Sequence, residues 1–290
     1  MNFTNGRELL DICEKHNKTI YEVCIEREIE LTSKTREEII QRMSHSLEIM
    51  KNSINKSITE DIKSVGGLIG GEAKLIRTRL ETGKTVCGSL MSKAISAAMG
   101  VLEVNASMGL IVAAPTAGSC GILPAAIITV AEEYGFSDED MINAIFAGAA
   151  IGAIITRNAT VAGAEGGCQA ETGAAAAMAA AGVVEMMGGS PRQAIHAAAT
   201  TLKNIMGLVC DPIAGLVEAP CQKRNAIGVA NALISAEVGL AGVESIVPFD
   251  EVVEAMYKVG KALPMELRET ALGGVAATCT GCAITKKVFG

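Results

Sequence analysis

Three cysteines lie at positions where a thiol could bind something other than protein. Cys210 comes two residues before Pro212, and Cys221 directly follows Pro220. A proline lacks a backbone donor and disfavours helix at the residue before it. Cys168 lies in the equally bend-prone run AEGGCQAE. We therefore expect these three thiols at bends or loop ends, where their thiolates are available to hold an iron–sulfur cluster.

The cysteine pattern by itself leaves two interpretations open. The chain has nine cysteines, and this odd number argues against a pure disulfide framework and favours metal or redox chemistry. The spacing of Cys168, Cys210 and Cys221 is not the compact ferredoxin run, so inert packing of these thiols is the alternative. Cys13 and Cys24 lie in apolar helical stripes and are expected to pack as small hydrophobic side chains.

A second candidate feature is the loop PTAGSCG at residues 115–121. Successive backbone N–H groups in such a loop, ahead of a helix, form an anion site that could hold a substrate carboxylate. The same turn residues are common in ordinary connections between helices, and composition alone favours that plainer interpretation. A helix-compatible run follows Pro124, and an apolar run precedes the loop.

The elements that must position these residues are predicted to be helices throughout, so the fold class is all-α. Residues 1–65 are an amphipathic helical arm, with apolar residues every three to four positions and a helix start at Thr35. The run SVGGLIGG at residues 64–71 lacks the spacing of a phosphate-binding loop and is interpreted as a hinge. Residues 66–290 form the catalytic body that would bind the cluster, and arm and body are expected to make one continuous domain.

The body is predicted to consist of closely packed helices. It is rich in alanine and glycine, whereas the chain has no tryptophan and only 3% aromatic residues. A core without large rings requires close approach between helix backbones. We expect a buried alanine helix after Cys168, a helix start at Ser137, and a helix that opens at Ser190-Pro191 and continues to Cys210.

Composition excludes several classes of partner. The formal charge of −7, with no basic block, argues against nucleic acid and acidic membranes. The mean hydropathy is +0.35, but no run offers about 20 clean apolar residues for a membrane span. The first residues lack the charged and apolar regions of a signal peptide. We expect a cytoplasmic enzyme or regulator without a membrane partner.

The longest motifs resemble a known family. PTAGSCGILPA, AEGGCQAE and CDPIAGLVEAPCQKRNA are similar to the α chain of the bacterial iron–sulfur-dependent L-serine dehydratases, also called L-serine ammonia-lyases. The likeness extends through SVGGLIGGEAK and ALGGVAATCTGC, so it covers nearly the whole chain. It implies a [4Fe–4S] cluster held by Cys168, Cys210 and Cys221, with the fourth iron open to substrate. It also implies a largely helical catalytic domain and a separate β chain that completes a heterodimer.

The resemblance implies a lyase of amino-acid degradation that needs no pyridoxal phosphate. The open iron would act as a Lewis acid on the hydroxyl of L-serine while a base removes the α-proton, giving pyruvate and ammonia. The substrate carboxylate would lie at Thr116, Ala117, Gly118 and Ser119. None of the three histidines, His16, His45 and His196, lies in a matched motif. We therefore expect the catalytic base on the partner chain.

Alternatives remain at this stage. An L-cysteine desulfidase would use the same cluster with a thiolate leaving group, and a redox-sensing iron–sulfur regulator or a silent scaffold subunit would have no activity. Cys279 and Cys282 form a CxxC motif, which supplies too few ligands for a zinc site. These two thiols, or Cys120 in the candidate substrate loop, could contact the fourth iron, and the sequence leaves that open. His196 is expected to be a core histidine bonded to a neighbour.

Overall fold

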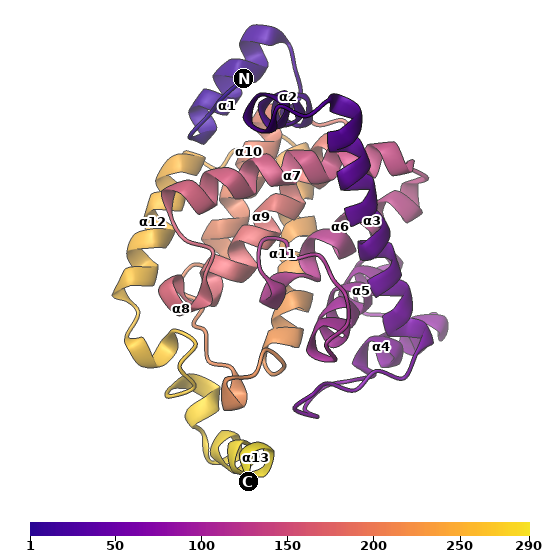
Figure 1. Ribbon diagram of the computed structural model, residues 1–290, viewed down its shortest axis with the longest axis vertical. Helices are drawn as coiled ribbons and strands as arrows, with labels where there is room; N and C mark the ends of the chain where they lie inside the picture. Colours follow the sequence, from indigo (N-terminus) through magenta and orange to yellow (C-terminus); the bar gives the residue numbers. More distant parts are fainter.

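The computed structural model describes residues 1–290 and contains helices but no strands, which confirms the all-α prediction (Figure 1). Its helices are α1 (Gly6–His16), α2 (Ile20–Thr32), α3 (Arg36–Thr59), α4 (Glu72–Glu81), α5 (Gly88–Ala106), α6 (Ile122–Tyr134), α7 (Asp138–Asn158), α8 (Gly163–Gly166), α9 (Cys168–Met186), α10 (Pro191–Asn204), α11 (Cys221–Leu240), α12 (Phe249–Ala262) and α13 (Cys279–Phe289). Four short 3₁₀ turns accompany them: η1 (Ala117–Ser119), η2 (Ile213–Gly215), η3 (Met265–Leu267) and η4 (Gly274–Ala277).

The alanine-rich helix α9 is the centre of the fold, with α6, α7, α10 and α11 packed around it (Figure 1). Nearly all of its side chains are buried. A β-carbon added to Gly182 would lie 2.5 Å from the carbonyl oxygen of Ala144 on α7. The absence of a side chain therefore lets the two helix backbones approach closely, as the composition predicted.

Acidic side chains of the body cap the first two helices of the arm. Asp250 of α12 accepts hydrogen bonds from the N–H groups of Gly6 (2.6 Å) and Arg7 (3.1 Å) at the start of α1. Glu185 of α9 accepts a hydrogen bond from the N–H of Ile20 (2.5 Å) at the start of α2. A carboxylate at a helix N-terminus satisfies donors that have no partner within the helix and complements the helix dipole. The arm therefore packs directly on the body, and its apolar side chains belong to the same hydrophobic core.

The predicted starts of the longer helices are confirmed. Thr35, Ser137 and Ser190 each form a capping box with a side chain three residues further on. Helix α7 is long and apolar enough to cross a membrane, yet 67% of its apolar window is buried inside the protein. It is therefore a helix of the core, packed mainly against α2 and α9.

One helix end differs from prediction. Helix α10 ends at Asn204 rather than continuing to Cys210. The chain turns there because Gly207 adopts a left-handed conformation (φ 88°) and the carbonyl of Leu208 accepts a hydrogen bond from the N–H of Gln169 (2.9 Å). The apolar run before the candidate substrate loop is not helical beyond Ala106, where α5 ends.

Candidate active site

The three predicted thiol ligands lie at the ends of elements and not in the middle of a helix. Cys168 is the first residue of α9, and Cys221 is the first residue of α11. Cys210 lies in the loop between α10 and α11, where its backbone pairs with the C-terminal segment around Arg268. Its N–H donates to the carbonyl of Leu267 (2.8 Å), and its carbonyl accepts from the N–H of Glu269 (2.7 Å).

The three thiols are buried and near enough to influence one another's ionisation. Burial is the main cause that raises the pKa of Cys221 to about 12, and negative charge on Cys168 adds to the shift. The pKa of Cys210 is raised by burial, then by Glu171 and by the thiolates of Cys168 and Cys221. Placing several thiolates here is therefore unfavourable unless a positive charge offsets them.

Part of that positive charge comes from Arg224, one helical turn after Cys221. Burial raises the pKa of Cys168, while a hydrogen bond from Thr172 (3.1 Å between Sγ and Oγ1) and the Arg224 guanidinium lower it. Arg224 also donates to Asp211 Oδ1 (2.6 Å). Asp211 accepts a second hydrogen bond, from the N–H of Val275 (2.7 Å), and thereby joins the cysteine loop to the C-terminal segment.

Removing the Arg224 guanidinium is expected to destabilise the protein strongly. The Asp211 side chain is only 3% exposed, so Arg224→Met leaves a buried carboxylate without its cation. Loss of one partner of a buried ion pair costs about 3–5 kcal/mol. Thermal unfolding of the metal-free protein measures the effect. The control is Arg192→Met, which breaks an exposed ion pair with Glu14 and should cost about 1 kcal/mol or less. Equal stability losses in the two variants would contradict this account.

Glu171 lies between the thiols and the candidate substrate loop. Its Oε1 accepts a hydrogen bond from the hydroxyl of Thr116 (3.0 Å), and its Oε2 is 4.0 Å from the Sγ of Cys210. Burial raises the pKa of Glu171 to about 7. A β-carbon added to Gly163 would meet both Glu171 Oε2 and Cys210 Sγ within 3 Å, so a glycine is required where α8 passes this pair. The carboxyl group therefore connects the two parts of the candidate site.

The candidate substrate loop is held from α11. Asn225 donates from Nδ2 to the carbonyl of Gly118 (2.8 Å), and its Oδ1 accepts from the N–H of Gly121 (3.1 Å). The hydroxyls of Thr116 and Ser119 are 3.0 Å apart. The N–H groups of Ala117 and Gly118 donate to no group of the chain. Two donors in this loop are thus available to an anion.

The remaining cysteines are placed differently. Cys120 is fully buried and packs with Val101, Leu102 and Cys221. Cys279 and Cys282 are exposed, at the start of α13. Cys13 and Cys24 are buried in the core, as predicted. No three His, Cys, Asp or Glu side chains of the chain converge closely enough to hold a single metal ion.

The histidines lie outside this arrangement. His16 and His45 are exposed on the arm. The Nδ1 of His196 accepts a hydrogen bond from the N–H of Ser245 (3.1 Å), as predicted, but the side chain is half-buried and does not belong to the core. His196 lines a small cavity together with residues of α1 and α12, and none of the three predicted thiol ligands lines that cavity.

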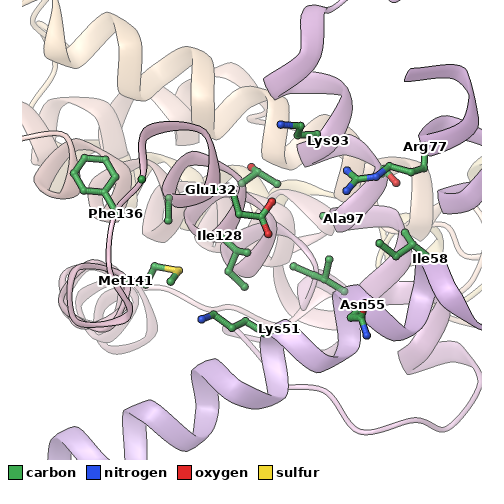
Figure 2. A pocket seen from close by; sticks show the side chains of 15 residues that line it. Lys51, Asn55, Ile58, Arg77, Lys93, Ala97, Ile128, Glu132, Phe136 and Met141 are labelled. Atoms are coloured by element: carbon green, nitrogen blue, oxygen red, sulfur yellow. The ribbon is translucent and has the colours of Figure 1, made fainter. Parts of the chain in front are cut away.

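One sizeable cavity is separate from the thiols. It has a volume of about 610 Å³ and lies between α3, α4, α5 and α6. Figure 2 shows that apolar side chains, such as Ile58 and Ile128, and charged side chains, Lys51, Arg77 and Glu132, line it together. None of the predicted site residues lines it, so this cavity is not part of the candidate site.

Several residues of the site were not predicted from the sequence. Arg224 and Asn225 follow Cys221 by three and four residues, and Thr172 follows Cys168 by four. In each case the signal was the helical period, which places side chains at these spacings on the same face as the cysteine. Once each cysteine is recognised as the first residue of a helix, these neighbours follow directly.

The structure is that of an all-α protein with an alanine-rich core, three buried cysteines at loops or helix starts, and a neighbouring loop with unpaired N–H groups. The chain belongs to the serine dehydratase alpha chain family, whose sequence pattern matches residues 15–276. It is 48% identical to the probable L-serine dehydratase, alpha chain, of Bacillus subtilis (strain 168), over 99% of this chain and 96% of that protein. It is 49% identical to the L-serine dehydratase, alpha chain, of Peptoniphilus asaccharolyticus, over 97% of this chain and 96% of that protein.

Longer relatives also match. The L-serine dehydratase 1 of Escherichia coli (strain K12) is 35% identical over 94% of this chain, and the matched region is 61% of that protein. These longer proteins therefore contain sequence that has no counterpart in this chain.

Proposed function

We propose that this chain is the α chain of a cytoplasmic, two-subunit L-serine dehydratase that uses a [4Fe–4S] cluster to convert L-serine into pyruvate and ammonia. The observation that carries the proposal is the grouping of Cys168, Cys210 and Cys221 beside a loop with two free N–H groups. Membership of the serine dehydratase alpha chain family supports the same reaction.

The donor set fits an iron–sulfur cluster. Burial raises the pKa of all three free thiols, and the charge of Cys168 adds to the shift of Cys210 and Cys221, so the positive charge of bound iron would stabilise them as thiolates. They do not converge on one point, as a single zinc ion would require, whereas a cluster distributes its ligands over several irons. When bound, the cluster would supply a Lewis acid for the substrate hydroxyl.

The residues of the chain hold and orient the substrate. The N–H groups of Ala117 and Gly118 are free to bind the serine carboxylate, and Thr116 and Ser119 add hydroxyl groups to the same loop. Asn225 lies one helical turn after Cys221 on α11, and its side chain bonds to the loop. It therefore fixes the loop relative to Cys221. Glu171 contacts both Thr116 and Cys210, so it fixes the distance between the carboxylate-binding loop and the thiols.

The base that removes the α-proton is proposed to come from a β chain. The three histidines of this chain lie away from the thiols or on the surface of the arm. The relatives that are 48% and 49% identical are named as alpha chains, which implies a β chain as partner, and the longer relatives contain additional sequence outside the matched region.

The proposed function is tested by measuring pyruvate after anaerobic reconstitution with iron and sulfide. L-serine and L-cysteine are compared as substrates, with and without the β chain. Faster pyruvate formation from serine supports the dehydratase, and preference for cysteine would instead support the desulfidase. A requirement for pyridoxal phosphate would overturn the proposal.

Air is expected to inactivate the enzyme reversibly. A cluster with one iron that has no protein ligand loses that iron on oxidation, so activity should decay in air and return after incubation with ferrous iron and a thiol. The measurement follows activity together with iron content over the same time course. Full activity after the loss of iron would show that the cluster does not take part in catalysis.

A further inference from the structure

The loop that carries Cys221 is tied to the glycine-rich segment at residues 64–71. Glu218, three residues before Cys221, is only 3% exposed. Its Oε1 accepts a hydrogen bond from the N–H of Gly66 (2.7 Å). Its Oε2 accepts from the hydroxyl of Ser64 (2.6 Å) and the N–H of Leu68 (3.0 Å). One buried carboxylate therefore organises three donors of a segment about 150 residues away in sequence.

The two segments also fit closely. A β-carbon added to Gly66 would lie 2.4 Å from Leu216 Cδ1 and 2.8 Å from Glu218 Oε1. Gly66 does not have a left-handed backbone, so the requirement for glycine here comes from contact with the cysteine loop and not from its own conformation. The glycine-rich segment is thus a packed support, and its N–H groups at Gly66 and Leu68 are unavailable to a phosphate.

A second connection lies on the other side of Cys221. Gln222 donates from Nε2 to Glu103 Oε1 (2.7 Å) and to Glu72 Oε2 (3.1 Å). Glu103 in turn accepts from the N–H of Ala73 at the start of α4 (3.0 Å). The residues on both sides of Cys221 are therefore fixed to residues 64–73.

We propose that Glu218 is a positioning residue for the iron–sulfur site, because it fixes the loop that carries Cys221 against the glycine-rich segment. The inference rests on the proposed role of Cys221 as a ligand. A carboxylate is suited to this task because charge-assisted hydrogen bonds are stronger than neutral ones and three donors can share its two oxygens.

The test compares Glu218→Gln with the wild type. Glutamine has the same shape, but its amide nitrogen is a donor and would face donors of the glycine-rich segment. After anaerobic reconstitution we expect kcat to fall about tenfold with KM for serine nearly unchanged, as for loss of an interaction that does not bind substrate. Iron and sulfide content should fall, and the visible absorption of the remaining cluster should decay faster in air.

Hydrogen exchange of the metal-free protein provides a readout that does not depend on the cluster. Glu218→Gln should accelerate exchange in both segments, 64–71 and 210–222, and leave the arm helices unchanged. Gly66→Ala should act in the same way through its contact with Leu216. The matched control is Glu81→Gln on α4, an exposed carboxylate with no hydrogen bond to either segment, which should behave as wild type.

The outcomes separate the two proposals. If the wild type binds no cluster, the proposed function fails, whereas the exchange measurement still tests the connection between the segments. If the wild type is loaded and Glu218→Gln shows unchanged iron content, cluster decay and kcat, the positioning role is overturned. Faster exchange throughout the chain would also overturn it, because that result indicates a general loss of stability.

Discussion

Replacing Cys168, Cys210 or Cys221 with alanine is expected to abolish cluster assembly and reduce serine deamination to background. Each thiol is one of only three side-chain ligands that we propose for the cluster. Losing one leaves two irons without a protein ligand, and the remaining buried thiols gain no stabilisation from metal. Iron and sulfide content of anaerobically reconstituted protein is the direct measurement, with pyruvate formation as the second.

The controls for this prediction are already present in the chain. Cys13→Ala and Cys24→Ala remove thiols that are equally buried but lie on the arm helices, in the hydrophobic core that arm and body share. They should retain full iron content and lose only a small amount of stability, because each substitution removes a single buried sulfur atom. A fully loaded and active Cys210→Ala enzyme would exclude the proposed ligand set.

The isolated chain is expected to show the cluster spectrum but only trace turnover of serine. Elimination requires a base within about 3 Å of the α-proton, directly or through one water. His196 is engaged with Ser245, and its ring lies in another part of the fold. Loss of one acid–base group typically lowers the rate by about 10²–10⁴-fold. Adding the β chain should restore the rate of serine turnover without changing the iron content.

This prediction has a clear opposite result. Full-rate turnover by the isolated chain would place the base in this chain. His196→Gln would then distinguish two candidate bases. Loss of turnover would identify the histidine, and unchanged turnover would leave Glu171, which lies beside the thiols. A β chain whose histidines are replaced should bind and fail to activate, which separates a catalytic contribution from simple stabilisation.

The sequence was most informative where local rules determine structure. The starts of α3, α7 and α10 depend on a capping side chain and its partner three residues later, so Thr35, Ser137 and Ser190 could be recognised directly. The buried alanine helix followed from composition. The positions of the three thiols at element ends followed from adjacent prolines and glycines.

Long-range pairing could not be derived in the same way. The end of α10 depends on a bond between Leu208 and Gln169, and the site of Cys210 depends on Leu267 and Glu269. These partners are tens of residues apart and share no pattern that periodicity reveals. The same holds for Glu218, whose acceptor role appears only when the glycine-rich segment lies beside it. Contacts of this kind decide the geometry of the site.

The pairing of the cysteine loop with the C-terminal segment also constrains the order of events during synthesis. Cys210 and Asp211 bond to the backbones of Leu267, Glu269 and Val275, which are translated more than 50 residues after the cysteine loop. While the ribosome still holds that segment, the earlier helices can fold, but the loop around Cys210 lacks its backbone partners. If the proposed cluster needs an ordered loop around Cys210, we expect its delivery to follow synthesis of residues 267–275, so the scaffold that donates it would recognise a largely folded chain.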